Sequence, residues 1–177
     1  SKELGTAYKG VMYGGFMKTA VGIKLLEYNA RFGDPEAMNV LPLLKTNFVD
    51  ICRAVVEGRL SKIKVELESK ATVCKYVVPE GYPHNPVTSK IEVPSVEKDY
   101  IKALVYYAAV EEREDGIYTT KSRAVAFVGI ADTIAASEKI AEEAAAMVKG
   151  TVFHRRDIGT HQLIQNRIEH IRRLLKP

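Results

Sequence analysis

The sequence has no tryptophan, only two cysteines, and no apolar run of the about 20 residues that a membrane-spanning helix requires. Cys52 and Cys74 show no CxxC spacing and have no histidine close in sequence, which argues against a metal site, and each lies in an apolar segment. We therefore expect two buried free thiols. The first nine residues lack the apolar core of a secretory signal, so we expect a cytoplasmic protein with no membrane partner.

Long blocks of like charge are also missing. The chain has 26 Lys and Arg residues against 22 Asp and Glu residues, a formal net charge of +4, and the two signs are interspersed. Proteins that bind nucleic acid often concentrate basic residues in one run, so we expect no nucleic acid partner. Hydrophobic residues make up 46% of the 177 residues, which is enough for a buried core in one domain and part of another.

The first sixty residues predict a hairpin followed by helices. Apolar, β-branched and aromatic residues dominate residues 8–19 and 22–30, as expected for two antiparallel strands joined by a short link. Asp34 followed by Pro35 predicts a helix start, because Asp can cap free backbone amides and Pro suits the first helical position. A second helix is expected at residues 47–57, with an Asn cap and a Gly stop.

The pattern changes after residue 60. Alternating strands are expected at 63–78, 103–111, 116–120 and 124–130, with a Pro- and Gly-rich loop at 79–94. Helical periodicity then predicts helices over 132–149 and 163–175. We therefore expect an α+β fold with two domains, one at 1–60 and a β-rich one with packed helices at 61–177.

The string LEYNARFGDPE, which begins at Leu26, is the most informative stretch for function. On a regular strand Glu27, Asn29 and Arg31 project from one face and Leu26 from the other. A carboxylate and an amide carbonyl are oxygen ligands of the kind that Mg²⁺ takes beside nucleotide phosphates, and an arginine fork suits a phosphate or carboxylate. The same spacing also suits a solvated strand edge or a hydrogen-bonded turn, so spacing leaves both interpretations open.

Longer strings resemble a known family. YKGVMYGGFM at 8–17, KLLEYNARFGDPE at 24–36 and LPLL at 41–44 are similar to the last ATP-grasp strands of glycinamide ribonucleotide synthetase. FHRRDIG at 153–159 resembles the C-terminal domain of the same family. The resemblance implies an ATP-dependent ligase that joins glycine to phosphoribosylamine in purine biosynthesis. It also implies that an N-terminal part is missing here, so we expect a C-terminal fragment that is inactive alone.

The resemblance also implies roles for individual residues. Glu27 and Asn29 would coordinate Mg²⁺ or Mn²⁺ bound to ATP, Arg31 would act on the substrate as a catalytic residue, and Leu26 would line the adenine pocket. In contrast, we expect Arg155 and its neighbours to form a structural ion pair and turn. Two other hypotheses remain: a different ATP-grasp carboxylate–amine ligase, or a noncatalytic module that binds an anion or a partner chain.

Overall fold

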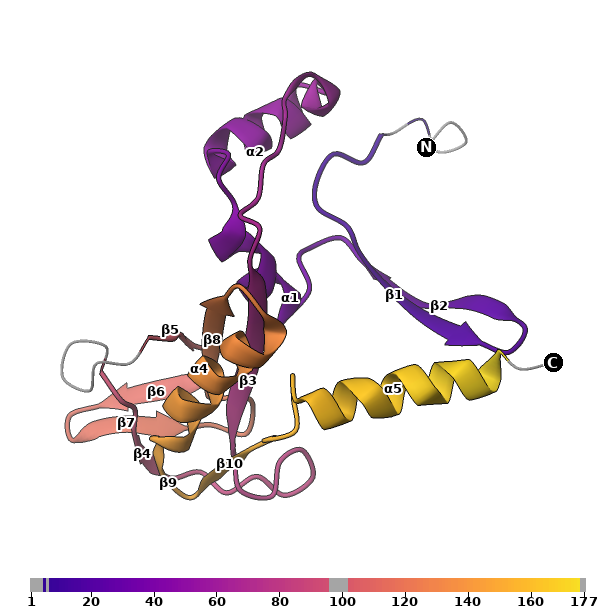
Figure 1. The fold of residues 1–177 in the computed structure, drawn as a ribbon. Coiled ribbons are helices and arrows are strands. Elements are labelled where there is room, and N and C mark those ends of the chain that lie inside the picture. Colours follow the sequence, from indigo (N-terminus) through magenta and orange to yellow (C-terminus); the bar gives the residue numbers. More distant parts are fainter. Residues whose placement is uncertain (1–4, 6, 96–101, 176–177) are drawn as a thin grey trace. The chain divides into compact units, whose positions relative to one another are not determined.

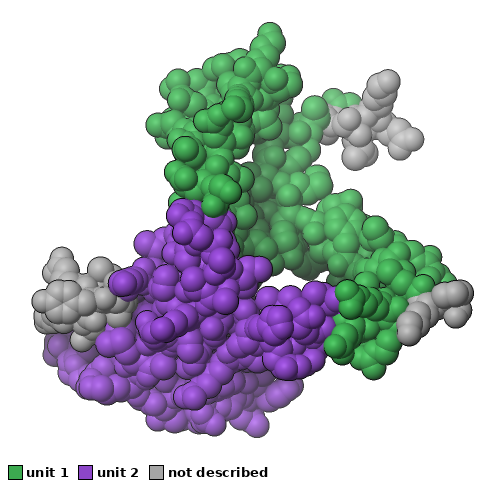
Figure 2. Space-filling view, in the orientation of Figure 1, with its two compact units in different colours: residues 1–69, 169–177 green, residues 70–168 purple. Residues whose placement is uncertain are grey.

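The chain folds into two compact units. The computed structural model describes residues 5, 7–95 and 102–175 (Figure 1). One unit comprises residues 1–69 and 169–177, and the other comprises residues 70–168 (Figure 2). Helices and antiparallel sheets occur together, which confirms the expected α+β fold class. Among the described residues, no helix is both long enough and apolar enough to cross a bilayer.

The first unit begins with a two-stranded hairpin of β1 (Tyr13–Thr19) and β2 (Gly22–Asn29). Gly22 has a φ of 121°, a conformation that favours glycine in this tight connection. The predicted hairpin is confirmed, but its first strand starts at Tyr13 rather than at residue 8. Tyr13 pairs with the last residue of β2, so the residues before it have no strand partner in the hairpin.

Two helices and two 3-10 turns follow the hairpin. They are α1 (Glu36–Val40), a 3-10 turn (Leu41–Leu43), α2 (Phe48–Val56) and a second 3-10 turn (Leu60–Lys62). The Asn47 side chain accepts hydrogen bonds from two backbone amides at the start of α2, which confirms the predicted cap. Cys52 is a free thiol as expected, but it is exposed. Its predicted burial is wrong because only Ala54 of α2 is fully buried.

The start of α1 differs from the prediction. Its N-cap residue is Pro35, and no side chain caps the helix. The amide of Ala37 instead donates to the carbonyl of Gly33 at 3.0 Å, so the backbone itself closes this turn. The N-cap position is therefore one residue later than the predicted Asp34.

The second unit contains two four-stranded antiparallel sheets. The strands are β3 (Ala71–Pro79), β4 (Lys90–Glu92), β5 (Leu104–Tyr107), β6 (Val110–Arg113), β7 (Gly116–Thr119), β8 (Val125–Ala131), β9 (Lys149–Gly150) and β10 (Val152–His154). Their orders are β10-β3-β8-β5 and β6-β7-β4-β9. The strand predicted at 103–111 is in fact two strands, one in each sheet. The predicted loop contains β4, and neither β9 nor β10 was predicted, although α4 ends at Ala146 and not at residue 149 as expected.

Helix α4 (Ile134–Ala146) packs on β3 and β8 of the first sheet (Figure 1). Val77, Phe127 and Ala144 belong to a buried apolar cluster that also includes Ile91 of the second sheet, so both sheets and the helix share one core. A Cβ on Gly129 of β8 would lie 2.9 Å from the carbonyl carbon of Ser137, which shows how closely helix and strand approach. The final helix, α5 (His161–Leu174), buries none of its described residues fully.

Candidate active site at the end of the hairpin

The residues predicted to form a site lie at the open end of the β1–β2 hairpin. Glu27 pairs with Gly15, and Asn29 pairs with Tyr13. Since Glu27 and Asn29 are two residues apart on one strand, they share a face, and Tyr13 shares it from the neighbouring strand. Tyr13, Glu27 and Asn29 define what we call the polar face, and the cross-strand partner of Glu27, Gly15, has no side chain.

A β-bulge interrupts the hairpin between Gly15 and Phe16, so that Leu26 is an extra residue in β2. A Cβ on Gly15 would lie 3.2 Å from Cγ of Glu27 and 3.8 Å from Cβ of Leu26. Leu26 and Glu27 therefore flank the same glycine. The expectation that Leu26 projects from the opposite face assumed a regular strand and is wrong at the bulge. The bulge places a largely exposed apolar side chain next to the carboxylate.

The opposite face of the hairpin is aromatic. Phe16 and Tyr28 meet edge to face with ring centroids 6.0 Å apart, and both rings are more than half exposed. A Cβ on Gly14 would lie 2.7 Å from Phe16 and 3.1 Å from Tyr28, so both rings cover this glycine. The two faces of the hairpin thus differ in chemistry, and the polar one carries the candidate site.

Arg31 lies two residues beyond the end of β2, so the strand alternation used to place it does not extend that far. Its Nη1 donates a hydrogen bond of 2.7 Å to the carbonyl of Phe32. The pKa of Tyr13 is raised mainly by its hydrogen bond to Glu36, and the charge of Arg31 opposes this rise only weakly. A guanidinium has five N–H donors, so Arg31 can also bind an anion there.

Glu36 reaches the polar face from the first turn of α1. The Tyr13 hydroxyl donates to Oε1 of Glu36 at 3.1 Å. This hydrogen bond and the Glu36 charge raise the pKa of Tyr13, with smaller raising contributions from burial and from the Glu27 charge. Sequence reasoning assigned Glu36 only a role in the helix terminus. The residue was missed because its approach depends on the tight turn at Gly33, which strand spacing does not reveal.

The polar face suits a divalent cation that is shared with a ligand. Glu27 and Asn29 offer two oxygen atoms as metal ligands. The Nδ2 group of Asn29, which can donate hydrogen bonds, is buried without a partner in the part of the chain that the structure describes. No group of three or more His, Cys, Asp or Glu side chains among the described residues could hold a metal ion. Because Mg²⁺ commonly keeps only one or two protein ligands and takes the rest from phosphates or water, this donor pair fits Mg²⁺ beside a nucleotide.

The second unit holds a separate cluster of charged residues beneath α4. The ammonium group of Lys75, whose side chain is fully buried, donates to Glu138 at 2.6 Å, to Glu142 at 2.6 Å and to the Arg156 carbonyl at 2.8 Å. Nε2 of His154 lies 3.1 Å from Glu142. This cluster links β3, α4, β10 and the segment that follows, so it stabilises the fold of this unit.

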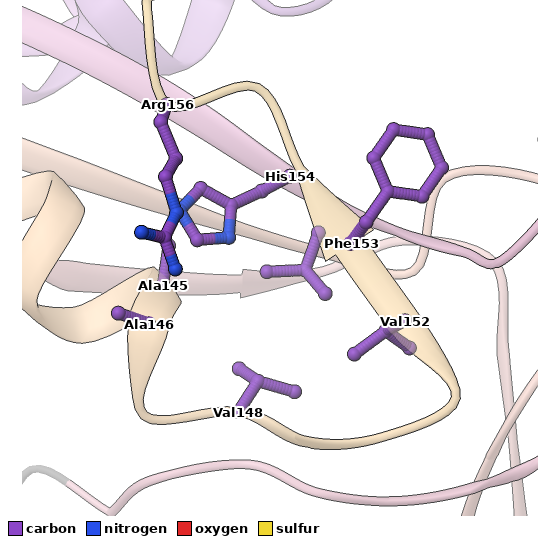
Figure 3. A pocket seen from close by; sticks show the side chains of 8 residues that line it. Ala145, Ala146, Val148, Val152, Phe153, His154 and Arg156 are labelled. Atoms are coloured by element: carbon purple, nitrogen blue, oxygen red, sulfur yellow. The ribbon is translucent and has the colours of Figure 1, made fainter.

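A pocket of about 220 Å³ lies beside this cluster. Figure 3 shows side chains of its wall, among them Val148, Val152, His154 and Arg156. Arg155 forms two hydrogen bonds with Asp157, at 3.0 and 2.6 Å. The predicted structural ion pair at this turn is therefore confirmed.

Comparisons with known proteins place both units in one family. Residues 72–161 match the family model described as phosphoribosylglycinamide synthetase, C domain, and residues 2–37 match its ATP-grasp (A) domain. The chain is 56% identical to a phosphoribosylamine–glycine ligase of Methanocella arvoryzae, over 96% of this chain and 39% of the relative. The corresponding protein of Methanocaldococcus jannaschii is 54% identical, over 98% of this chain and 39% of the relative.

A solved structure gives the same result. The crystal structure of a phosphoribosylamine–glycine ligase from Thermotoga maritima superimposes with a TM-score of 0.72 and 28% identity, covering 89% of this chain and 39% of that chain. The chain therefore spans well under half the length of the relatives it matches.

Proposed function

Since the chain belongs to the phosphoribosylglycinamide synthetase family, we propose that it forms part of a phosphoribosylamine–glycine ligase. The complete enzyme would join glycine to 5-phosphoribosylamine in the cytoplasm at the expense of ATP. The observation that supports this most is the polar face, where Glu27 and Asn29 share one side of β2 with the bulged Leu26 beside them. The proposed division is an ATP-grasp part at 1–60 and a C-terminal domain at 61–177.

The proposed reaction has two steps. The carboxylate of glycine first takes the terminal phosphoryl group of ATP, which gives glycyl phosphate and ADP. The amine of phosphoribosylamine then attacks the acyl carbon, and phosphate leaves as the amide forms. Neither step needs a covalent intermediate on the protein, so the side chains of this chain bind and position the reactants.

Each residue of the polar face has a proposed part in this positioning. Mg²⁺ or Mn²⁺, when held by Glu27, Asn29 and ATP phosphates, would offset the negative charge on the transferred phosphoryl group. Arg31 would bind the glycine carboxylate or the phosphoryl oxygens through its planar donors. Leu26, brought to the same side by the bulge, would contact the adenine ring. Because Glu27 and Asn29 are the two proposed metal ligands, their replacement should lower the activity most.

The test uses a fused ligase, in which the preceding part of the Methanocella arvoryzae ligase is joined to this chain. ADP release is expected to depend on both glycine and phosphoribosylamine. Glu27→Gln and Asn29→Ala should each lower kcat/KM about 100-fold or more, as expected when charge stabilisation at a transferring group is lost. Glu66→Gln is the matched control, because Glu66 is a partly exposed carboxylate of the same unit and pairs with Lys64.

Two results would contradict the proposal. If the fused ligase accepts some other amine but not phosphoribosylamine, the chain belongs to a different carboxylate–amine ligase. If Glu27→Gln and Asn29→Ala turn over as fast as Glu66→Gln, the polar face does not form the proposed site. This chain alone, without the preceding part of the ligase, is expected to release no ADP.

A further inference from the structure

The Glu36 carboxylate is held against the hairpin by an unusually close approach at Gly33. Gly33 is buried. A Cβ at this position would clash with Oε2 of Glu36 and would lie 2.8 Å from Cδ2 of Tyr13. A side chain at position 33 would therefore push the carboxylate or the tyrosine ring out of this arrangement. The turn between β2 and α1 thus brings Glu36 back toward the polar face.

Tyr13 fixes the orientation of that carboxylate. Its hydroxyl donates to Oε1 of Glu36 at 3.1 Å. On the other side, Tyr13 pairs with Asn29 in the hairpin, and the charges of Glu27 and Arg31 both act on its hydroxyl. Glu36 therefore lies beside the proposed metal and phosphate site, but it is attached through Tyr13 rather than to either proposed metal ligand.

Glu36 is exposed, and among the described residues no cation forms a direct ion pair with it. In the described part of the chain its carboxylate takes part in a hydrogen bond with a neutral phenol and in no ion pair. A carboxylate that is oriented, partly engaged and without a cation is suited to receive a positively charged ligand group. Among the proposed substrates, glycine has such a group. Its carboxylate must face the transferred phosphoryl group, and its ammonium nitrogen is only two bonds from the carboxylate carbon.

We propose that Glu36, oriented by Tyr13, binds the ammonium group of glycine while the glycine carboxylate faces Glu27, Asn29 and Arg31. This inference rests on the function proposed above. It assigns substrate specificity to Glu36: a carboxylic acid without an ammonium group, such as acetate, lacks this charge-assisted contact and binds more weakly. Glu36 would be a substrate-binding residue and would take no part in proton transfer.

The experiment measures steady-state kinetics of the fused ligase with Glu36→Gln and Tyr13→Phe, with Glu66→Gln as the control. Glu36→Gln is expected to raise the KM for glycine about tenfold or more, because a charge-assisted contact is lost. The KM for ATP and the nucleotide-dependent affinity for Mn²⁺ should stay within about twofold. Tyr13→Phe should raise the glycine KM by a smaller factor, since Glu36 keeps its charge but loses its orienting bond. Circular dichroism checks that each variant is folded.

The outcomes separate this inference from the proposed function. If the wild-type fused ligase shows no glycine-dependent ADP release, the proposed function fails and the inference with it. If wild type is active and Glu36→Gln leaves the glycine KM unchanged, the inference alone is overturned. It is also overturned if Glu36→Gln weakens Mn²⁺ binding, which would make Glu36 a metal ligand, or if only kcat falls, which would make it a base. Should Glu36→Gln not fold, an unchanged glycine KM in Tyr13→Phe overturns the inference.

Discussion

Replacement of Lys75 by methionine should destabilise the second unit strongly. The Lys75 side chain is fully buried, whereas the side chains of its partners Glu138 and Glu142 are 18% and 26% exposed. The substitution keeps most of the side-chain volume but removes the buried ammonium group that both carboxylates share, so that only His154 at 3.1 Å and Arg156 at 3.8 Å remain beside Glu142. Removing one partner of a buried ion pair costs about 3–5 kcal/mol, and the partial exposure of both glutamates favours the lower end of that range.

The predicted loss is therefore about 3 kcal/mol, which for a unit of about 100 residues corresponds to a Tm lower by about 12 °C. Thermal unfolding of the chain followed by circular dichroism measures this change. Lys139→Met is the matched control on α4, because Lys139 is exposed and lies 3.9 Å from Glu143. Its cost should stay below about 0.5 kcal/mol. Adding Glu138→Gln and Glu142→Gln to Lys75→Met should restore part of the stability.

The reasoning would be refuted if Lys75→Met lowered the Tm no more than Lys139→Met does. It would also be refuted if the two added glutamine substitutions made the methionine variant less stable still, because then the carboxylates would not repel each other.

Three further predictions concern stability. Asn47→Ala should cost about 1 kcal/mol through loss of the α2 cap, seen as faster amide exchange in α2, and unchanged exchange would contradict the cap. Gly129→Ala should cost at least about 2 kcal/mol in chemical unfolding, since its Cβ would strike the Ser137 backbone, and a neutral effect would contradict that contact. Burial alone would raise the pKa of Glu142, but hydrogen bonds from Lys75 and His154 hold it below the usual value. That stabilisation is complete above the unfolded-state pKa of about 4.3 and disappears as the pH falls through the lower folded-state pKa. Glu142→Gln should therefore lose less stability than wild type when the pH is lowered from 6 into the acid range. Unfolding curves of both proteins, measured in parallel at each pH, test this.

Features encoded by neighbouring residues could be predicted from the sequence. The hairpin follows from two runs rich in apolar, β-branched and aromatic residues joined by a short link, and α2 follows from an Asn cap and a Gly stop, because both depend on local backbone preferences. The pairing of Arg155 with Asp157 was predictable for the same reason, since the two residues are only two positions apart in the chain. The resemblance of the string around Glu27 to a known family located the candidate site, where spacing alone left it open.

Features that depend on distant partners could not be predicted in this way. The bulge at Leu26 depends on the register with β1, and the approach of Glu36 depends on the turn at Gly33. The local strand pattern gives no sign that Lys75 is buried. Its burial depends on two glutamates that lie more than sixty residues later in the chain. The exposure of Cys52 likewise reflects the limited packing of α2, which an apolar helical pattern does not report.

The central claim is that Glu27 and Asn29 together hold a divalent cation that also binds a nucleotide. Electron paramagnetic resonance of Mn²⁺ added to the fused ligase with a non-hydrolysable ATP analogue tests this most directly. We predict nucleotide-dependent binding that Glu27→Gln and Asn29→Ala each weaken about tenfold or more, while Glu66→Gln leaves it unchanged. Equal Mn²⁺ affinity in all four proteins would contradict the claim.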